Sequence, residues 1–136
     1  MPASSCPLEE ILPHRPPMVL IDRVTAFDLS ARTLTASVCV KEEWRGNWVA
    51  IEYMAQTAAA LVGLVDKAEN RPNVGRPGFL LGTRSLKLAI PEFEVGKTYA
   101  VQVHTEFEDD ASASFSCVIK DGDTDVATAI ISAYRP

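Results

Sequence analysis

One stretch decides the fold: Trp48 to Asp66, which reads WVAIEYMAQTAAALVGLVD. It is dense in Ala, Leu and Met and is apolar around nearly its whole circumference, a pattern typical of a helix enclosed by the rest of the protein. Asn47 is the predicted N-cap, and the polar residues from Asp66 to Pro72 end the helix. A long buried helix therefore lies at the centre of the predicted fold.

Strand patterns flank this helix on both sides. Met18–Phe27 and Thr33–Lys41 precede it, and four segments bounded by turn residues follow it. Those four are Phe79–Ile90, Tyr99–Phe107, Ser112–Lys120 and Val126–Tyr134. We expect one α+β domain over residues 1–136, in which an antiparallel sheet, with its last four strands in a meander, wraps the helix. The exposed edge of such a sheet is commonly covered in a two-fold dimer.

Composition excludes several classes of protein. The 136 residues are 47% hydrophobic and 23% charged, and the formal charge of −5 argues against a broad surface for nucleic acid. Cys6, Cys39 and Cys117 lie far apart without zinc-ligand spacing, so we expect reduced thiols and no metal. The chain opens without a signal-peptide pattern, and no apolar run reaches the ~18 residues of a spanning helix. We therefore expect a cytoplasmic protein with no membrane insertion.

Glu52 is the first candidate for chemistry, because the predicted helix carries almost no other charge before Asp66. A buried carboxylate must be paired, hydrogen-bonded, protonated or facing a polar cavity. Gln56 lies one turn later on the same face and is a possible partner. Two interpretations stay open: Glu52 transfers protons, or it complements the helix dipole or pairs with an arginine.

Three further positions outside the helix call for an explanation. His14 lies in a proline-rich stretch, Leu12–Pro17, which either holds the imidazole for acid–base chemistry or gives it a structural role. His104 is expected to face solvent, opposite the alternating apolar residues from Tyr99 to Phe107. Gly82 interrupts a bulky strand and indicates a bulge or a close approach of ligand or backbone.

Two motifs resemble one enzyme family. Leu12–Val24, LPHRPPMVLIDRV, resembles the opening motif of the FabZ-like 3-hydroxyacyl-[acyl carrier protein] dehydratases, and Ile51–Gln56, IEYMAQ, resembles their central helix. The longer stretch Trp48–Gln56 looks more like the ApeP-like branch, associated with aryl polyene-type lipid pathways. The resemblance implies a hotdog fold, in which a six-stranded antiparallel sheet wraps a long helix and subunits dimerise through sheet edges to form acyl tunnels.

The activity implied by the resemblance is elimination of water from 3-hydroxyacyl thioesters in fatty acid or aryl polyene-type lipid synthesis. The substrate is carried on a phosphopantetheine thioester, and no cofactor is implied. One departure concerns the catalytic histidine: where the family has Gly-His-Phe-Pro-Gly, this chain reads KEEWRGNW from Lys41 to Trp48. We therefore expect Glu52 and His14 to be catalytic, with a backbone amide near Asn47 or Trp48 polarising the thioester carbonyl.

The remaining expected contacts are those with substrate, carrier and partner subunits. Substrate-binding positions are Asn47, Trp48, Gln56, Gly82, Tyr53 and Phe79, and the apolar tunnel is expected at Met18, Leu20, Tyr53 and Phe79. Basic residues near the helix exit either dock an acidic carrier or form a scattered solvated face; they are Arg71, Arg76, Arg84 and Lys87. Expected partners are acyl carrier protein or acyl-coenzyme A, and a second copy of the chain in a homodimer or a higher oligomer of dimers.

Two alternative functions stay open. Glu52 alone could serve a hotdog acyl thioesterase by activating water or attacking the acyl carbonyl. A dehydratase-like subunit without the family's histidine could instead be inactive by itself and pair with an active paralogous dehydratase. Fold alone does not decide between these chemistries.

Overall fold

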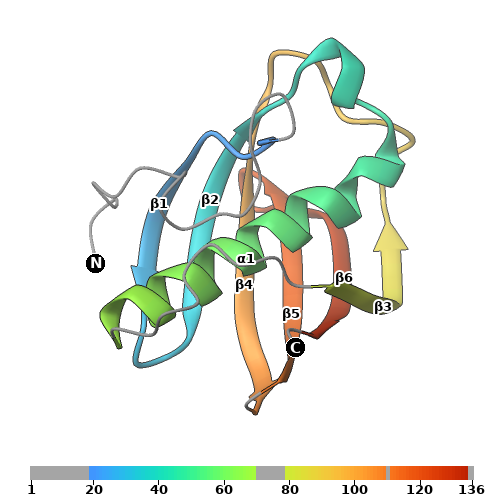
Figure 1. The fold of residues 1–136 in the computed structure, drawn as a ribbon. Helices are drawn as coiled ribbons and strands as arrows, with labels where there is room; N and C mark the ends of the chain where they lie inside the picture. The colour runs from blue at the N-terminus through green and yellow to red at the C-terminus, as the bar shows by residue number, and fades with distance from the viewer. Residues whose placement is uncertain (1–18, 70–78, 110, 135–136) are drawn as a thin grey trace.

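A six-stranded sheet wraps one long helix in the computed structural model, which describes residues 19–69, 79–109 and 111–134 (Figure 1). The strands are β1 (Arg23–Asp28), β2 (Thr33–Cys39), β3 (Phe79–Leu88), β4 (Thr98–Glu108), β5 (Ser112–Asp121) and β6 (Thr124–Tyr134). Every neighbouring pair is antiparallel, in the order β1-β2-β4-β5-β6-β3. The predicted α+β fold is confirmed.

The helix α1 spans Ala50–Ala68 and follows two short 3₁₀ helices, η2 (Glu42–Trp44) and η3 (Asn47–Val49). The prediction that Asn47 caps the helix is wrong, because Val49 occupies the N-cap position and no side chain caps it. Asn47 instead opens η3, and its side-chain amide donates to the carbonyl of Ile90 at 3.3 Å. That amide ties the entry of the helix to the segment after β3.

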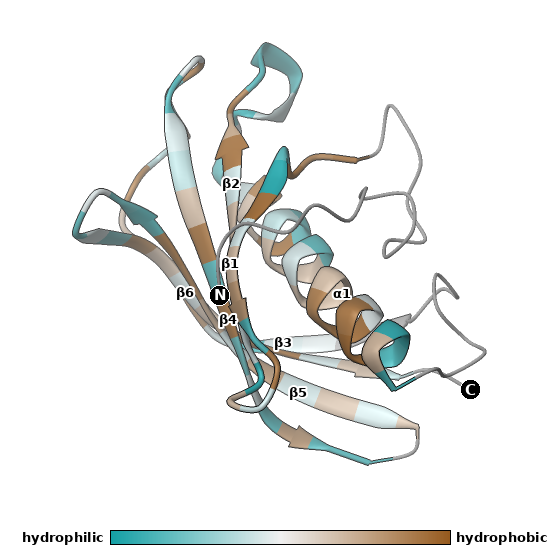
Figure 2. Cartoon of the chain, turned by 90° about the vertical axis from the view of Figure 1, so that its left-hand side faces the viewer, coloured by the Kyte–Doolittle hydropathy of each residue, from teal (hydrophilic) through white to brown (hydrophobic). Residues whose placement is uncertain are grey.

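The core lies between α1 and the inner face of the sheet, which curls around one side of the helix (Figure 2). Along β2 and β4, alternate apolar residues point inward and are buried, as the strand period requires. On the helix, Tyr53, Met54 and Leu61 are almost fully buried. Each such side chain contributes about 1.5–3 kcal/mol by leaving water.

The segment Asn47–Ala68 is long and apolar enough to cross a membrane by length and composition. In this fold, however, 67% of its 18-residue apolar window is buried, and α1 packs against β2, β4, β5 and β6. The core helix of a globular domain passes the same test of length and hydropathy. A narrow stripe of α1 stays half-buried; its members are Ile51, Glu52, Ala55, Ala59 and Val62.

The predicted meander is wrong in one place, because β3 pairs with β6 at the edge of the sheet and not with β4. The chain returns from this edge to the middle of the sheet through the connection between β3 and β4. Phe93 anchors that connection: it is buried, and its ring makes edge contacts with Tyr53 at 5.4 Å and Tyr99 at 5.1 Å. A segment expected to be a simple turn thus supplies part of the core.

Candidate active site

Glu52 lies in the first turn of α1 with its side chain half-buried. The unpaired N–H groups of a helix start favour a negative charge at this position. The carboxylate oxygen Oε1 accepts a hydrogen bond from Nε2 of Gln56 at 3.0 Å, as the spacing of four residues predicts. Glu52 is therefore held on the half-buried stripe of the helix.

Gln56 is fully buried and uses both ends of its side-chain amide. Its Oε1 accepts from the backbone N–H of Leu20 at 2.7 Å, while Nε2 donates to Glu52. The contact with Leu20 spans 36 positions along the chain, and a backbone donor leaves no mark in a sequence pattern. Sequence reasoning therefore found one end of this amide and missed the other.

The segment before α1 is built around two tryptophans. The rings of Trp44 and Trp48 meet edge to face at 6.2 Å, and the hydroxyl of Tyr53 donates to the carbonyl of Trp44 at 2.7 Å. The indole of Trp48 folds back across Gly46, where a Cβ atom would collide with the indole nitrogen. Trp48 is 63% exposed, so an apolar ring lies on the surface just before the N-terminus of α1, one turn before Glu52.

Two of the predicted tunnel residues belong to the core of this chain. Leu20 and Tyr53 are both buried, and burial raises the pKa of the Tyr53 phenol far above its ordinary value. The hydroxyl of Tyr53 is therefore neutral and acts as a donor to Trp44. Its expected role in substrate binding stays a prediction, as does that of Leu20 in the tunnel.

The edge strand β3 carries four of the predicted positions. Beside Phe79 these are Gly82, Arg84 and Lys87, all three of them exposed. The register of the β3–β6 pair shifts between Leu80 and Gly82 and again between Arg84 and Lys87. The register shift beside Gly82 agrees with the predicted bulge, and a Cβ atom there would meet nothing within 4 Å. A close approach of ligand at Gly82 stays a prediction. Ser85, in the second irregularity, has a φ of 57°.

Several predicted positions lie outside the described residues, so the structure places neither their side chains nor their contacts. They are His14, Met18, Arg71 and Arg76, together with the side chain of Phe79.

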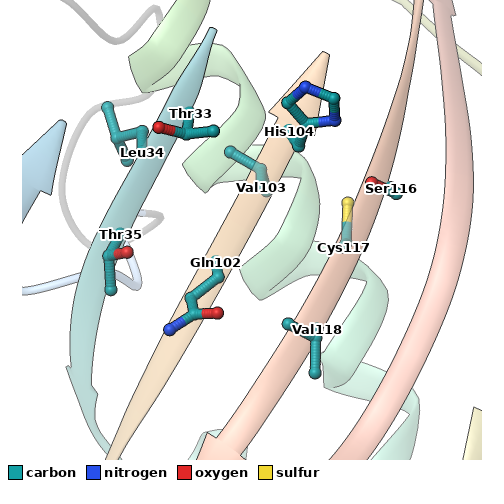
Figure 3. A pocket seen from close by; sticks show the side chains of 9 residues that line it. All are labelled: Thr33, Leu34, Thr35, Gln102, Val103, His104, Ser116, Cys117 and Val118. Carbon is teal, nitrogen blue, oxygen red and sulfur yellow. The ribbon is translucent and has the colours of Figure 1, made fainter. Parts of the chain in front are cut away.

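His104 is the one histidine among residues 19–69, 79–109 and 111–134, and it lies on the outer face of β4 (Figure 3). Its Nδ1 is 3.0 Å from Oε1 of Glu106, which also accepts a hydrogen bond from Ser116 at 2.7 Å. His104 and Ser116 border a shallow groove of about 410 Å³ over β2, β4 and β5. The expected exposure of His104 is confirmed, and the sheet separates it from Glu52.

The described part of the chain contains no group of three His, Cys, Asp or Glu side chains that could hold a metal ion.

Comparison with known proteins places this geometry among dehydratases. Residues 6–136 match the model of the ApeP-like family, described as ApeP dehydratase. The chain is 30% identical over 142 residues to the 3-hydroxyacyl-[acyl-carrier-protein] dehydratase FabZ of Chlamydia pneumoniae, an alignment covering 84% of this chain and 92% of that protein.

Two solved structures share the fold of this chain. The dehydratase heterocomplex ApeI:P from Xenorhabdus doucetiae aligns with a TM-score of 0.88 and 26% identity, over 98% of this chain and 93% of that one. A hypothetical thioesterase from Streptococcus pneumoniae, solved with coenzyme A, aligns with a TM-score of 0.62 and 8% identity, over 82% and 83%. The second likeness shows the fold alone.

Proposed function

The chain belongs to the ApeP-like dehydratase family, and on that premise we propose that Glu52 is the proton-transfer carboxylate of a site completed by a second, paralogous subunit. It is a 3-hydroxyacyl thioester dehydratase-like protein, a hydro-lyase by reaction class. The single observation that supports the composite site most strongly is that the solved relative with a TM-score of 0.88 is a dehydratase heterocomplex, while His104 lies across the sheet from Glu52. A thioesterase function is not favoured by these relatives.

The reaction needs two proton transfers. Dehydration breaks the C2–H and C3–O bonds of the 3-hydroxyacyl group and forms a C2=C3 double bond and water. A base takes the C2 proton, an acid protonates the departing hydroxyl group, and hydrogen-bond donors stabilise the thioester oxygen as charge builds on it. Glu52 supplies one of the two transfers, and a histidine supplies the other.

The proposed donors to the thioester oxygen are the N–H groups of Asn47 and Trp48. They open η3, and the first N–H groups of a helical turn have no acceptor within it. The carbonyls of Trp44 and Arg45, three residues earlier, already accept from Tyr53 and from the N–H of Phe93. Both donors stand one turn before Glu52 on the chain.

Two histidines are candidates for the second transfer. One is His14, predicted from the sequence; the other belongs to a paralogous dehydratase subunit. We favour the paralogous subunit, because the solved relative with a TM-score of 0.88 is a dehydratase heterocomplex and the Lys41–Trp48 segment carries no histidine. His14→Ala in the complex separates the two sources.

The edge strand β3 is the proposed subunit interface. All of the described side chains from Gly82 to Ala89 are exposed, including Leu86 at 41% and Leu88 at 36%. An unpaired edge with exposed apolar side chains is a template for a second strand. In this proposal a strand of the partner pairs along β3, and the acyl chain lies between the two subunits.

The acyl group arrives as a phosphopantetheine thioester of acyl carrier protein or coenzyme A, and no metal or organic cofactor takes part in this proposal. Arg84 and Lys87, exposed on β3, are the described members of the predicted docking surface for an acidic carrier. The substrate class is fatty acyl or aryl polyene-type acyl thioesters. The protein is expected to act as a soluble enzyme in the cytoplasm.

The test uses the full chain alone and co-purified with the paralogous dehydratase, with formation of the enoyl thioester followed by absorbance. We expect little activity from the chain alone and clear activity from the complex. His14→Ala in the complex is compared with His104→Ala, a matched removal of the histidine across the sheet. Both should retain activity if the partner supplies the histidine, whereas a selective loss in His14→Ala of about 10²–10⁴-fold assigns the role to His14. Equal activity of the chain alone and the complex would overturn the composite site.

A further inference from the structure

Gln56 has no exposed surface, and each end of its amide already has a partner. Its Oε1 accepts from the backbone N–H of Leu20 at 2.7 Å, and its Nε2 donates to Oε1 of Glu52 at 3.0 Å. A residue that contacts substrate in this subunit would have to present a polar atom to a surface. The contacts of Gln56 run inward instead, from the segment before β1 to the carboxylate.

The orientation of this amide is fixed by chemistry. A peptide N–H can only donate, so the atom of Gln56 that faces Leu20 must be the oxygen. The amide NH₂ then has to face Glu52. The flipped orientation would bring two donors together at Leu20 and two acceptors together at Glu52, both in the interior, where unmatched polar groups are costly.

The segment that carries the Leu20 donor is itself anchored to the sheet. The backbone N–H of Asp22 donates to the carbonyl of Ser37 at 2.8 Å, and the Asp22 carboxylate accepts from the N–H of Cys39 at 2.6 Å. A continuous set of contacts therefore leads from β2 through Asp22, Leu20 and Gln56 to Glu52. The Leu20 N–H that holds Gln56 is therefore itself held in place by hydrogen bonds to β2.

We infer that Gln56 is a positioning residue, which holds the Glu52 carboxylate in the orientation used for proton transfer and does not bind the acyl substrate. The inference rests on the proposed role of Glu52 in the dehydratase site. It replaces the sequence-based expectation that Gln56 contacts substrate. A carboxylate with one oxygen tied to a buried amide cannot rotate freely, and misplacement of a reacting group by about 1 Å can cost about 10²-fold in rate.

Two variants separate the ends of the amide. Gln56→Met removes both hydrogen bonds at nearly constant volume. Gln56→Glu keeps an acceptor for Leu20 and, in alkaline buffer, replaces the donor with a second carboxylate, so it isolates the contact with Glu52. Thr57→Val is the matched control: Thr57 is equally buried on the next position of α1, and its hydroxyl donates only to the carbonyl of Tyr53 in the bonds described, at 2.7 Å.

The kinetic test uses the active complex and separates kcat from KM. We expect both Gln56 variants to lower kcat by about tenfold to hundredfold with KM within about twofold of wild type. Thr57→Val should keep kcat, and thermal unfolding of all three variants shows that the fold is retained. A rise in KM at unchanged kcat would overturn the inference, because it would mean that Gln56 binds substrate.

A second measurement does not depend on activity. The carboxyl ¹³C resonance of Glu52, identified by its absence in Glu52→Gln, is compared in wild type, Gln56→Met and Thr57→Val in one neutral buffer. We expect the chemical shift of this resonance to change in Gln56→Met alone, since only that variant removes the amide that donates to the Glu52 carboxylate. An unchanged chemical shift overturns the positioning inference. A changed chemical shift in a protein whose complex never dehydrates a thioester supports the contact between Gln56 and Glu52 and overturns the proposed function.

Discussion

Glu52 and Glu106 accept similar hydrogen bonds on opposite sides of the sheet, but in different surroundings. Glu52 is half-buried on α1, and its donor is the fully buried amide of Gln56. Glu106 is exposed on β4, where Ser116 donates to it at 2.7 Å and His104 lies 3.0 Å away. Hydrogen bonds and a nearby histidine do not by themselves make an active site. The burial of the donor is what distinguishes the Glu52 side, because water competes with every contact of Glu106.

The largest expected difference between the two faces is in activity. Glu52→Gln in the complex should lower the rate of dehydration by about 10²–10⁴-fold, because the amide cannot transfer a proton. Glu106→Gln should leave the rate within about twofold. Enoyl formation measured side by side for the two variants makes the comparison. Equal effects on both faces would contradict the assignment of the inner face to catalysis.

The second comparison is between a buried and an exposed phenylalanine, in what each contributes to the free energy of unfolding. Phe93→Ala should lower the free energy of unfolding by about 3–5 kcal/mol, because Phe93 is buried against Tyr53 and Tyr99. Phe107, on β4, is 57% exposed, and Phe107→Ala should change it by no more than about 0.5 kcal/mol. Chemical denaturation of both variants measures the difference. A small effect at Phe93 would mean that the β3–β4 connection is not part of the core.

The third comparison is between a buried and an exposed cysteine, in the rate at which each thiol is alkylated. Burial raises the pKa of the Cys117 thiol to about 12, so only about one thiol in ten thousand is ionised near pH ~8. Cys39 is exposed at the end of β2. Iodoacetamide should therefore modify Cys39 at least about a hundredfold faster than Cys117, as followed by mass spectrometry of the cysteine peptides. In denaturant the two rates should converge, and a persistent difference would point to a local sequence effect.

The smallest expected effect is the acid dependence of the outer carboxylate. Hydrogen bonds from Ser116 and then from His104 hold the pKa of Glu106 below its ordinary value of 4.5. Because the folded-state pKa lies below the unfolded one, this stabilisation is present above pH 4.5 and is lost as the pH falls through the lowered value. Ser116→Ala should therefore be slightly less stable than wild type in urea at neutral pH. The difference should disappear in acid; a constant difference would exclude Glu106 as its origin.

Local patterns were sufficient to predict the helix and the six strands. The apolar circumference of Trp48–Asp66 and the alternation along β2 and β4 are properties of neighbouring residues, and the structure reproduces both. The alternation fails at one point: the register of β4 shifts between Thr105 and Phe107, which turns Phe107 outward although it was expected on the apolar face. A bulge of this kind depends on the partner strand and has no local signature.

Long-range contacts were beyond the reach of the same patterns. The position of β3 beside β6 is a pairing between strands that are far apart in the sequence, whereas pairing along the chain would have placed β3 beside β4. At the candidate site, the spacing of four residues was enough to pair Gln56 with Glu52. The donor at Leu20 is a backbone N–H, which every residue except proline possesses. No residue type in the sequence could therefore predict this hydrogen bond.

The two register shifts of β3 affect how its exposed edge can pair with other chains before a partner is bound. An exposed edge strand promotes the stacking of further chains into fibrils when the strand is long and regular. The register shifts at Leu80/Gly82 and Arg84/Lys87 divide this edge into short regular segments. Two cationic side chains, Arg84 and Lys87, are exposed on it. An arbitrary β-strand would lose its ladder within a few residues. We therefore expect the irregular edge of β3 to pair poorly with arbitrary strands, which would limit aggregation of newly made chains.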